Sequence, residues 1–163
     1  MKKFNILMIL AVLTLVWGCK DSDGDGGSNS STSAQYLTPG TDARPSWQKP
    51  DYNEFENTMY IQFQLQEQFA SYVTDQDLMC AMIGGEVRAL TAPNESEGDT
   101  YFPLSIAANG GEEDVTIAYY CDRLHRIYKP ENYLYFDTSM SPTDAEGNPY
   151  VLTIIPNDNK KGK

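Results

Sequence analysis

Residues 78–91 read LMCAMI-GG-EVRALT, two short runs rich in apolar side chains on either side of Gly84-Gly85. A pair of glycines can adopt the positive φ angles that a two-residue hairpin turn needs, because glycine has no Cβ atom to clash. Short runs bounded by such a turn are typical of β-strands. The stretch therefore predicts a β-hairpin with strands at 78–83 and 86–91.

A second pattern, upstream of this hairpin, also indicates a strand. Between Tyr60 and Gln66 the residues Ile61, Phe63 and Leu65 alternate with glutamines. That period of two is the pattern of a strand with one buried face. A helix would place Ile61 and Leu65 on one stripe but would leave Phe63 on the wrong side, so a strand is favoured.

The rest of the chain continues in short strands and frequent turns. Strands are predicted at 100–108 and 114–121 around an Asn109-Gly110-Gly111 turn, and then at 124–129, 133–136 and 150–155. Seven to eight such strands predict an all-β fold, a single antiparallel β-sandwich of the immunoglobulin-like kind, over residues 37–156. Residues 157–163 are a polar tail. Three prolines between 38 and 53 predict an extended lead-in held by Trp47.

Composition limits the size and the partners of this domain. The chain has 163 residues, of which 40% are hydrophobic, and a formal net charge of −11. This length suits one domain with a sizeable core. The negative charge disfavours nucleic acid, because each phosphate contact would work against repulsion.

The first 18 residues have the anatomy of a signal peptide. Lys2 and Lys3 precede an apolar run over residues 6–17, which is too short to span a membrane as a helix. Gly18-Cys19 follows, and the junction resembles the lipobox of bacterial lipoproteins. The resemblance implies that Cys19 becomes the new N-terminus and carries fatty acyl chains such as palmitate. An ordinary secretory signal with an incidental cysteine is the alternative.

Residues 19–36 are predicted to be a flexible acidic tether, because 20–35 contain no large apolar side chain. Asp21, Asp23 and Asp25 match the first half of a calcium-binding EF-hand loop, but Thr32 stands where the final glutamate ligand is needed, so no metal site is expected. The run Lys20-Asp21-Ser22-Asp23 directly after the cysteine resembles the export signal of Bacteroidetes surface lipoproteins. A plain solvated spacer is the alternative.

The hairpin region resembles a strand–turn–strand element of Bacteroidetes surface proteins. Residues 78–90 carry the first part, Tyr101–Ile106 the second and Val115–Tyr120 the third. The resemblance implies a β-sandwich accessory module with no shared catalytic motif, of the kind that accompanies SusC/SusD-type transporters, TonB-dependent importers of glycans or oligopeptides.

Residues that could support catalysis do not form a recognisable set. His125 is the one histidine, and it lacks the neighbouring ligands or bases that a zinc site or a catalytic triad requires. Glu112, Glu113 and Asp114 could in principle serve a glycosidase, but they follow the predicted turn, where a solvated charge cluster is the usual outcome. We therefore expect neither an enzyme nor a bound cofactor, and a surface or edge position for His125.

Two cysteines and a group of tyrosines remain to be interpreted. Cys80 and Cys121 could form a disulfide outside the cytoplasm, or Cys80 could be a free thiol facing inward in its strand. Tyrosines are enriched in binding surfaces, and the candidates for ligand or partner contact are Tyr120, Tyr133 and Tyr135. Because Tyr119 and Tyr120 are adjacent in a strand, one should be in the core and the other exposed.

Together these resemblances imply an outer-membrane lipoprotein on the cell surface. It would be a non-catalytic accessory subunit of a SusC/SusD-like nutrient uptake complex, anchored by lipid and in contact with the transporter. The alternative is an adhesion or envelope-structural β-sandwich module.

Overall fold

The computed structural model describes residues 37–96, 98–111, 113–130 and 134–154. The predicted signal peptide, tether and polar tail lie outside these residues, as does Tyr133. Within them the elements are η1 (Tyr52–Glu54), β1 (Asn57–Leu65), α1 (Glu67–Ala70), β2 (Leu78–Ile83), β3 (Glu86–Thr91), β4 (Asn94–Ser96), β5 (Asp99–Ala108), β6 (Asp114–Cys121), β7 (Arg126–Tyr128), β8 (Leu134–Tyr135) and β9 (Tyr150–Leu152).

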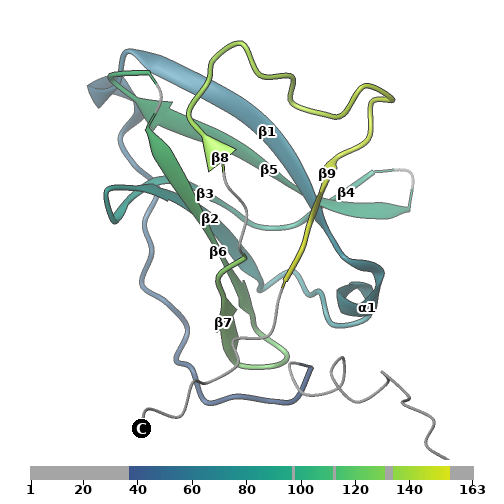
Figure 1. The fold of residues 1–163 in the computed structure, drawn as a ribbon. Helices are drawn as coiled ribbons and strands as arrows, with labels where there is room; N and C mark the ends of the chain where they lie inside the picture. The colour runs from purple at the N-terminus through teal and green to yellow at the C-terminus, as the bar shows by residue number, and fades with distance from the viewer. Residues whose placement is uncertain (1–36, 97, 112, 131–133, 155–163) are drawn as a thin grey trace, which may run out of the picture.

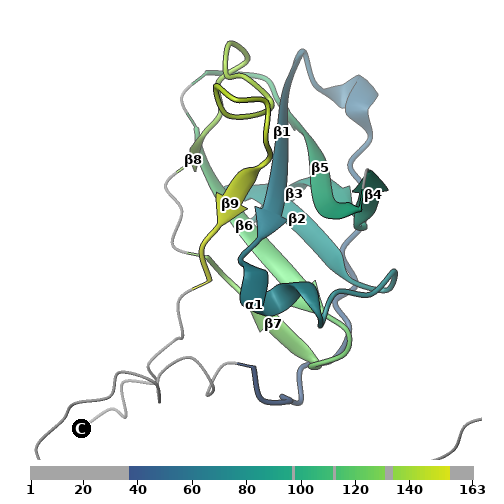
Figure 2. The same ribbon diagram turned by 90° about the vertical axis from the view of Figure 1, so that its right-hand side faces the viewer.

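The strands form two sheets, which confirms the all-β, sandwich-like fold (Figure 1). One sheet has the order β4-β5-β1-β9, and the other has the order β3-β2-β6-β7, with β8 also paired to β6. Figure 2 shows the four-stranded sheet in front of the five-stranded one. The pairs are antiparallel except β1 with β9, which run parallel. The finer assignment to an immunoglobulin-like topology stays a prediction.

The hairpin of β2 and β3 is confirmed. Gly84 and Gly85 have φ angles of 60° and 86°, and Ile83 pairs with Glu86 across the turn. The register shifts between Ala81 and Met82, which makes a bulge in the hairpin. The positive φ angles are therefore the local reason why two glycines occupy this turn.

The predicted turn at 109–111 does not close a hairpin. β5 pairs with β1 in the first sheet, whereas β6 pairs with β2 in the second. The segment between them instead crosses from one sheet to the other. Glu113 and Asp114 therefore lie at a crossover between the layers rather than on a hairpin turn, while Glu112 lies outside the described residues.

Three predicted strands are shorter than expected, and three short elements were not predicted. β7 begins at Arg126 rather than 124, because residues 122–125 form a turn in which the His125 N–H donates to the Asp122 carbonyl at 3.2 Å. His125 has a φ angle of 47°, a conformation incompatible with a strand. β8 and β9 cover only part of 133–136 and 150–155. The unpredicted elements are the 3-10 helix η1, the helix α1 and the strand β4.

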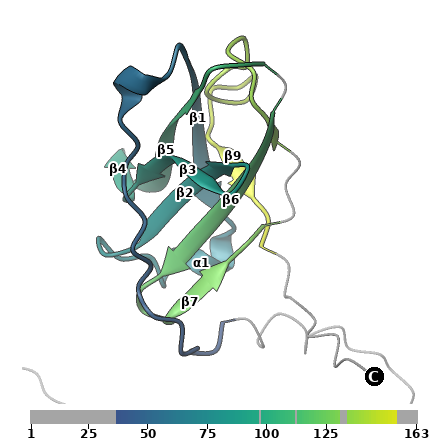
Figure 3. The same cartoon turned by 90° about the vertical axis from the view of Figure 1, so that its left-hand side faces the viewer.

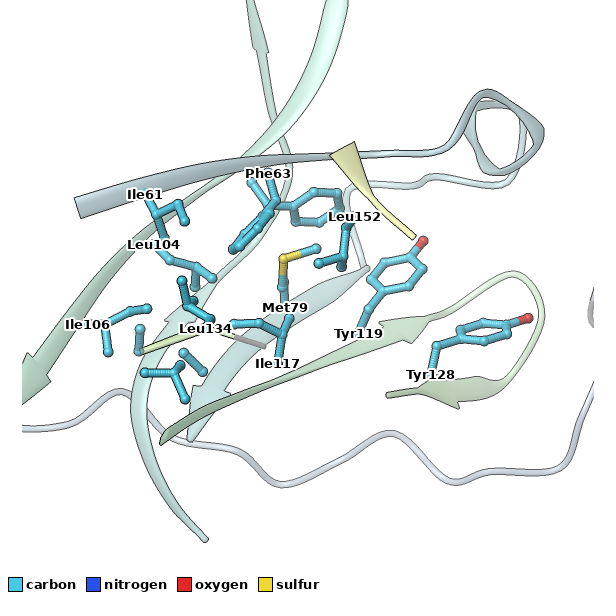
Figure 4. Close-up of a cluster of buried hydrophobic side chains, with 14 of the residues drawn as sticks. Ile61, Phe63, Met79, Leu104, Ile106, Ile117, Tyr119, Tyr128, Leu134 and Leu152 are labelled. Carbon is cyan, nitrogen blue, oxygen red and sulfur yellow. The ribbon is translucent and has the colours of Figure 1, made fainter. Parts of the chain in front are cut away.

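The core lies between the sheets and follows the alternation of each strand (Figure 4). Met59, Ile61 and Phe63 of β1 face it from one sheet, and Ile117 and Tyr119 of β6 face it from the other. Tyr119 stacks on Tyr128 with ring centroids 6.0 Å apart. Burial of these side chains is the main source of stability in a domain of this size.

The lead-in covers part of the outer face of the five-stranded sheet (Figure 3). We call residues 37–51 the strap. Gly40 N–H donates to the Leu124 carbonyl at 2.7 Å, and the Asp42 carboxylate accepts from Ile127 N–H at 2.8 Å. A Cβ on Gly40 would lie 2.5 Å from Cγ of Arg126, so only glycine allows this close approach. Trp47, the predicted anchor of the lead-in, is half-buried.

Candidate functional site

A hollow that we call the tip pocket lies at one end of the sandwich. It has a volume of about 840 Å³ and is lined from three segments: Asn57 at the start of β1, residues 109–111 of the β5–β6 crossover, and residues 135–138 at β8 and beyond. The pairing of Asp114 with Tyr135 brings the last segment beside the crossover. The volume falls within the range of small-molecule binding sites.

Tyr135 is the predicted contact residue that the structure brings to this pocket. Its side chain is 54% exposed, whereas the neighbouring Phe136 is buried in the core. Alternation along the chain explains this pair, because the buried Phe136 fixes the backbone while Tyr135 faces solvent. A large aromatic side chain left exposed next to a hollow is an uncommon feature and a typical element of binding sites.

The polar residues of the tip pocket are held by local hydrogen bonds. Asn109 accepts from Glu56 N–H at 2.9 Å through its side-chain oxygen, which ties the crossover to the start of β1. Asp137 accepts from both the N–H and the hydroxyl of Ser139, at 2.8 and 2.7 Å. These bonds lower the pKa of Asp137, so the carboxylate is ionised near neutral pH. One side of the pocket therefore carries a fixed negative charge.

A smaller hollow lies on the outer face of the four-stranded sheet. It has a volume of about 400 Å³, and Tyr52 and Tyr60 stand beside Lys49 in its lining. Tyr60 is 61% exposed. Burial, with a smaller contribution from Tyr60, raises the pKa of Tyr52. Sequence reasoning did not select these tyrosines, although the outward position of Tyr60 follows from the alternation of β1.

Tyr120 is not available for contact, which corrects its prediction as a binding residue. Tyr119 faces the core as expected, and Tyr120 lies on the opposite face of β6, yet its side chain is only 1% exposed. The strap accounts for this burial, because the guanidinium of Arg44 lies over the Tyr120 ring at 5.8 Å. Burial raises the pKa of Tyr120, and the nearby Asp122 carboxylate raises it further.

Cys80 and Cys121 are both buried free thiols, so the disulfide considered for them is not formed. Cys80 pairs with Ala118, whereas Cys121 belongs to the strand face that packs in the core with Tyr119. Their side chains therefore leave the sheet on opposite faces, which no disulfide can join without moving the backbone. Cys80 consequently faces the outer side of its sheet, not inward as predicted, and burial raises its pKa to about 12.

His125 is exposed on the β6–β7 turn, as predicted for a surface histidine. It lies at the Cys121 end of β6, whereas Glu113 and Asp114 lie at the other end. With about 3.4 Å per residue, the eight residues of β6 separate the two ends by roughly 24 Å. The histidine and these carboxylates therefore cannot act on one substrate bond. Within the described residues, no group of three or more His, Cys, Asp or Glu side chains could hold a metal ion.

One buried carboxylate was not singled out from the sequence. Asp77, before β2, is fully buried and accepts hydrogen bonds from the Tyr119 hydroxyl, from Thr74 Oγ1 at 2.9 Å and from Asp122 N–H at 2.9 Å. Burial and the Asp77 carboxylate raise the pKa of Tyr119, so the phenol stays protonated and donates. The Asp77 carboxylate itself has no access to solvent, so it serves the fold and not a ligand.

Comparison with known proteins identified no relative of this chain. No protein-family model, curated protein or solved structure matches the chain. The resemblance to surface lipoproteins therefore rests on the sequence motifs alone. In the part of the chain that the structure describes, neither helix is long and apolar enough to cross a membrane.

Proposed function

We propose that this protein is a lipid-anchored surface lipoprotein of the outer membrane that acts as a non-catalytic accessory subunit of a SusC/SusD-like nutrient importer. The observation that carries the proposal is the apolar run ending in Gly18-Cys19, followed at once by the acidic run at 20–23. The first feature supports acylation, and the second supports display on the cell surface. More than one acyl chain gives stable attachment to a bilayer.

The attachment of the strap supports an oriented domain. The strap is hydrogen-bonded at Gly40 and Asp42 to the β6–β7 turn, so the described part of the chain begins at this end of the sandwich (Figure 1). The tip pocket lies at the opposite end of β6. In a protein anchored through Cys19, the tip pocket would therefore lie at the end of the domain opposite the one where the strap is attached.

The distribution of reactive groups supports a binding role over catalysis. His125 and the carboxylates beside the tip pocket lie at opposite ends of β6, and Asp77 has no contact with solvent. General acid–base catalysis requires such groups within hydrogen-bond reach of one reacting atom. Confinement to a membrane surface raises the effective concentration of a membrane partner, so a modest interface suffices for an accessory subunit.

The test is a pull-down of the full chain from detergent-solubilised outer membranes, with a Cys19→Ser variant as the control. We expect a SusC/SusD-like transporter to be recovered with the native chain. We expect the variant to be lost from the membrane fraction, because it cannot be acylated. Recovery of the native chain without a transporter, or normal membrane localisation of the variant, would contradict the proposal.

A further inference from the structure

The lining of the tip pocket combines one exposed aromatic face with amide, hydroxyl and carboxylate groups. Asn57 is exposed at the start of β1, and the structure gives its side chain no hydrogen bond to the described residues. Asp137 uses one carboxylate oxygen for Ser139, which leaves the other oxygen to accept from a ligand. Thr138 adds a hydroxyl group, and Tyr135 adds a half-exposed ring.

Two of the polar side chains that line the tip pocket are also held in place before any ligand binds. Asn109 is fixed by its bond to the backbone of Glu56, and Asp137 is fixed by two bonds from Ser139. Gly111 has open space where a Cβ would stand, so a ligand can approach the crossover backbone closely. Groups that are already held in place lose little entropy when a ligand binds. The pocket therefore meets the geometric conditions for a binding site without rearrangement.

We propose that the tip pocket binds a neutral saccharide, the end or a short internal segment of an uncharged glycan. Sugar hydroxyl groups both donate and accept hydrogen bonds. Carboxamide and hydroxyl side chains do the same, while the free oxygen of Asp137 accepts. The apolar C–H face of a sugar ring packs on an exposed aromatic ring such as that of Tyr135, which buries area at low entropic cost.

The charge of the lining disfavours anionic ligands. An anionic ligand would meet Asp137, and also Glu113, whose carboxylate oxygen would lie 3.2 Å from a Cβ added to Gly110. A lysine or arginine side chain would pair with Asp137 but carries no acceptor for the amide and hydroxyl donors beside it, so a basic peptide would have to meet those donors with its backbone carbonyls. Asn57 and Thr138 supply donors for which a sugar hydroxyl provides acceptors, whereas the side-chain amide of Asn109 already donates to the Glu54 carbonyl at 3.4 Å. A neutral saccharide, whose hydroxyl groups both donate and accept, suits the mixture of amide, hydroxyl and carboxylate groups that lines the pocket.

This inference rests on the proposed function for the outward orientation of the pocket, but saccharide binding can be measured without a transporter. The full chain in detergent micelles is titrated by calorimetry with four neutral hexasaccharides built from glucose (α- and β-linked), xylose and mannose. A galacturonate hexamer and a lysine hexapeptide serve as the charged probes. We expect at least one neutral probe to bind with a Kd of about 1 mM or tighter.

Variants then assign the binding to the pocket. Tyr135→Ala is expected to weaken binding at least tenfold, and Asp137→Asn and Asn57→Ala several-fold. Tyr60→Ala is the matched control, because it removes an equally exposed tyrosine from the outer face of β1, and it should leave the affinity unchanged. Thermal unfolding of each variant checks that the fold is retained, which the exposure of these four side chains favours.

The proposal is overturned if none of the neutral hexasaccharides binds, or if Tyr60→Ala weakens binding as much as Tyr135→Ala. Stronger binding of the lysine hexapeptide, lost in Asp137→Asn, would identify a peptide site instead and would also overturn it. A transporter recovered with the Tyr135→Ala variant would show that the accessory role stands independently. Failure of the saccharide site and failure of the proposed function are thereby distinguishable.

Discussion

Removal of the buried carboxylate of Asp77 tests whether polar groups hold one end of the sandwich together. Asp77 is fully buried and is the shared acceptor for Tyr119 of β6, for Thr74 and for the backbone N–H of Asp122. Asp122 begins the turn between β6 and β7, so the carboxylate joins the segment before β2 to the end of β6. The variants are Asp77→Ala and Tyr119→Phe.

The magnitude follows from the donors that each change leaves unmatched. An unsatisfied buried donor costs about 1–3 kcal/mol, and Asp77→Ala leaves the fully buried Tyr119 hydroxyl in that state and removes the acceptor of two partly buried donors, Thr74 Oγ1 and Asp122 N–H. We therefore expect Asp77→Ala to lower the free energy of unfolding by about 3–5 kcal/mol. Tyr119→Phe keeps the ring packing against Phe102 and Tyr128, so it should cost about 2 kcal/mol.

The assay is urea unfolding followed by circular dichroism, analysed by linear extrapolation. Asp75→Ala is the matched control, because Asp75 is exposed two residues earlier and its removal should change the free energy by less than about 0.5 kcal/mol. In thermal unfolding, Tyr119→Phe should lower Tm by roughly 8 °C, at about 4 °C per kcal/mol. If Asp77→Ala were no more damaging than Asp75→Ala, the reasoning about this network would be wrong.

Three further predictions concern the hairpin, the thiols and the tyrosines. Gly84→Ala should destabilise the fold by about 1 kcal/mol, because Gly84 has a φ angle of 60°. Gly111 has no positive φ angle, so Gly111→Ala should leave the stability unchanged. Equal Tm values for the two variants would contradict this prediction. Cys80 and Cys121 should react with a thiol reagent at pH 8 only after unfolding, because both are buried and the pKa of Cys80 is raised to about 12; rapid labelling of the native protein would refute this. Burial raises the pKa of Tyr128 from 10.0 to about 12, so the folded state keeps this proton more tightly than the unfolded state. Stability should therefore fall as pH rises from about 10 toward 12, and a flat stability profile over that range would be inconsistent with it.

Local sequence signals predicted the parts of the fold that depend on local geometry. The glycine pair at 84–85 predicted the β2–β3 turn, because the positive φ angles of such a turn are a property of those two residues alone. The alternation of Ile61, Phe63 and Leu65 predicted β1, since the period of side-chain burial is set by the strand itself. Signals of this kind do not depend on which other strand pairs with the element.

The errors occurred where distant segments decide the outcome. Asn109-Gly110-Gly111 has the composition of a hairpin turn, but β5 is held by β1 and β6 by β2, so the segment is a crossover. Alternation correctly placed Tyr119 and Tyr120 on opposite faces. The burial of Tyr120 depends on Arg44, which lies far away in the sequence and covers the ring. Asp75 and Asp77 likewise look equivalent in the sequence, and only the packing of β6 distinguishes them.

The sequence predicted one residue of the tip pocket but not the pocket itself. Tyr135 was selected as an aromatic contact, but its neighbours in the pocket come from the start of β1 and from the β5–β6 crossover. Two registers bring them together: Asn57 opposite Ala108, and Asp114 opposite Tyr135. A shift of either pairing by one residue would turn the paired side chains to the other face of the sheet and separate the ring from the amides. The pocket is therefore a product of strand register between segments about 50 and 20 residues apart, and this long-range pairing is the information that composition and local periodicity do not carry.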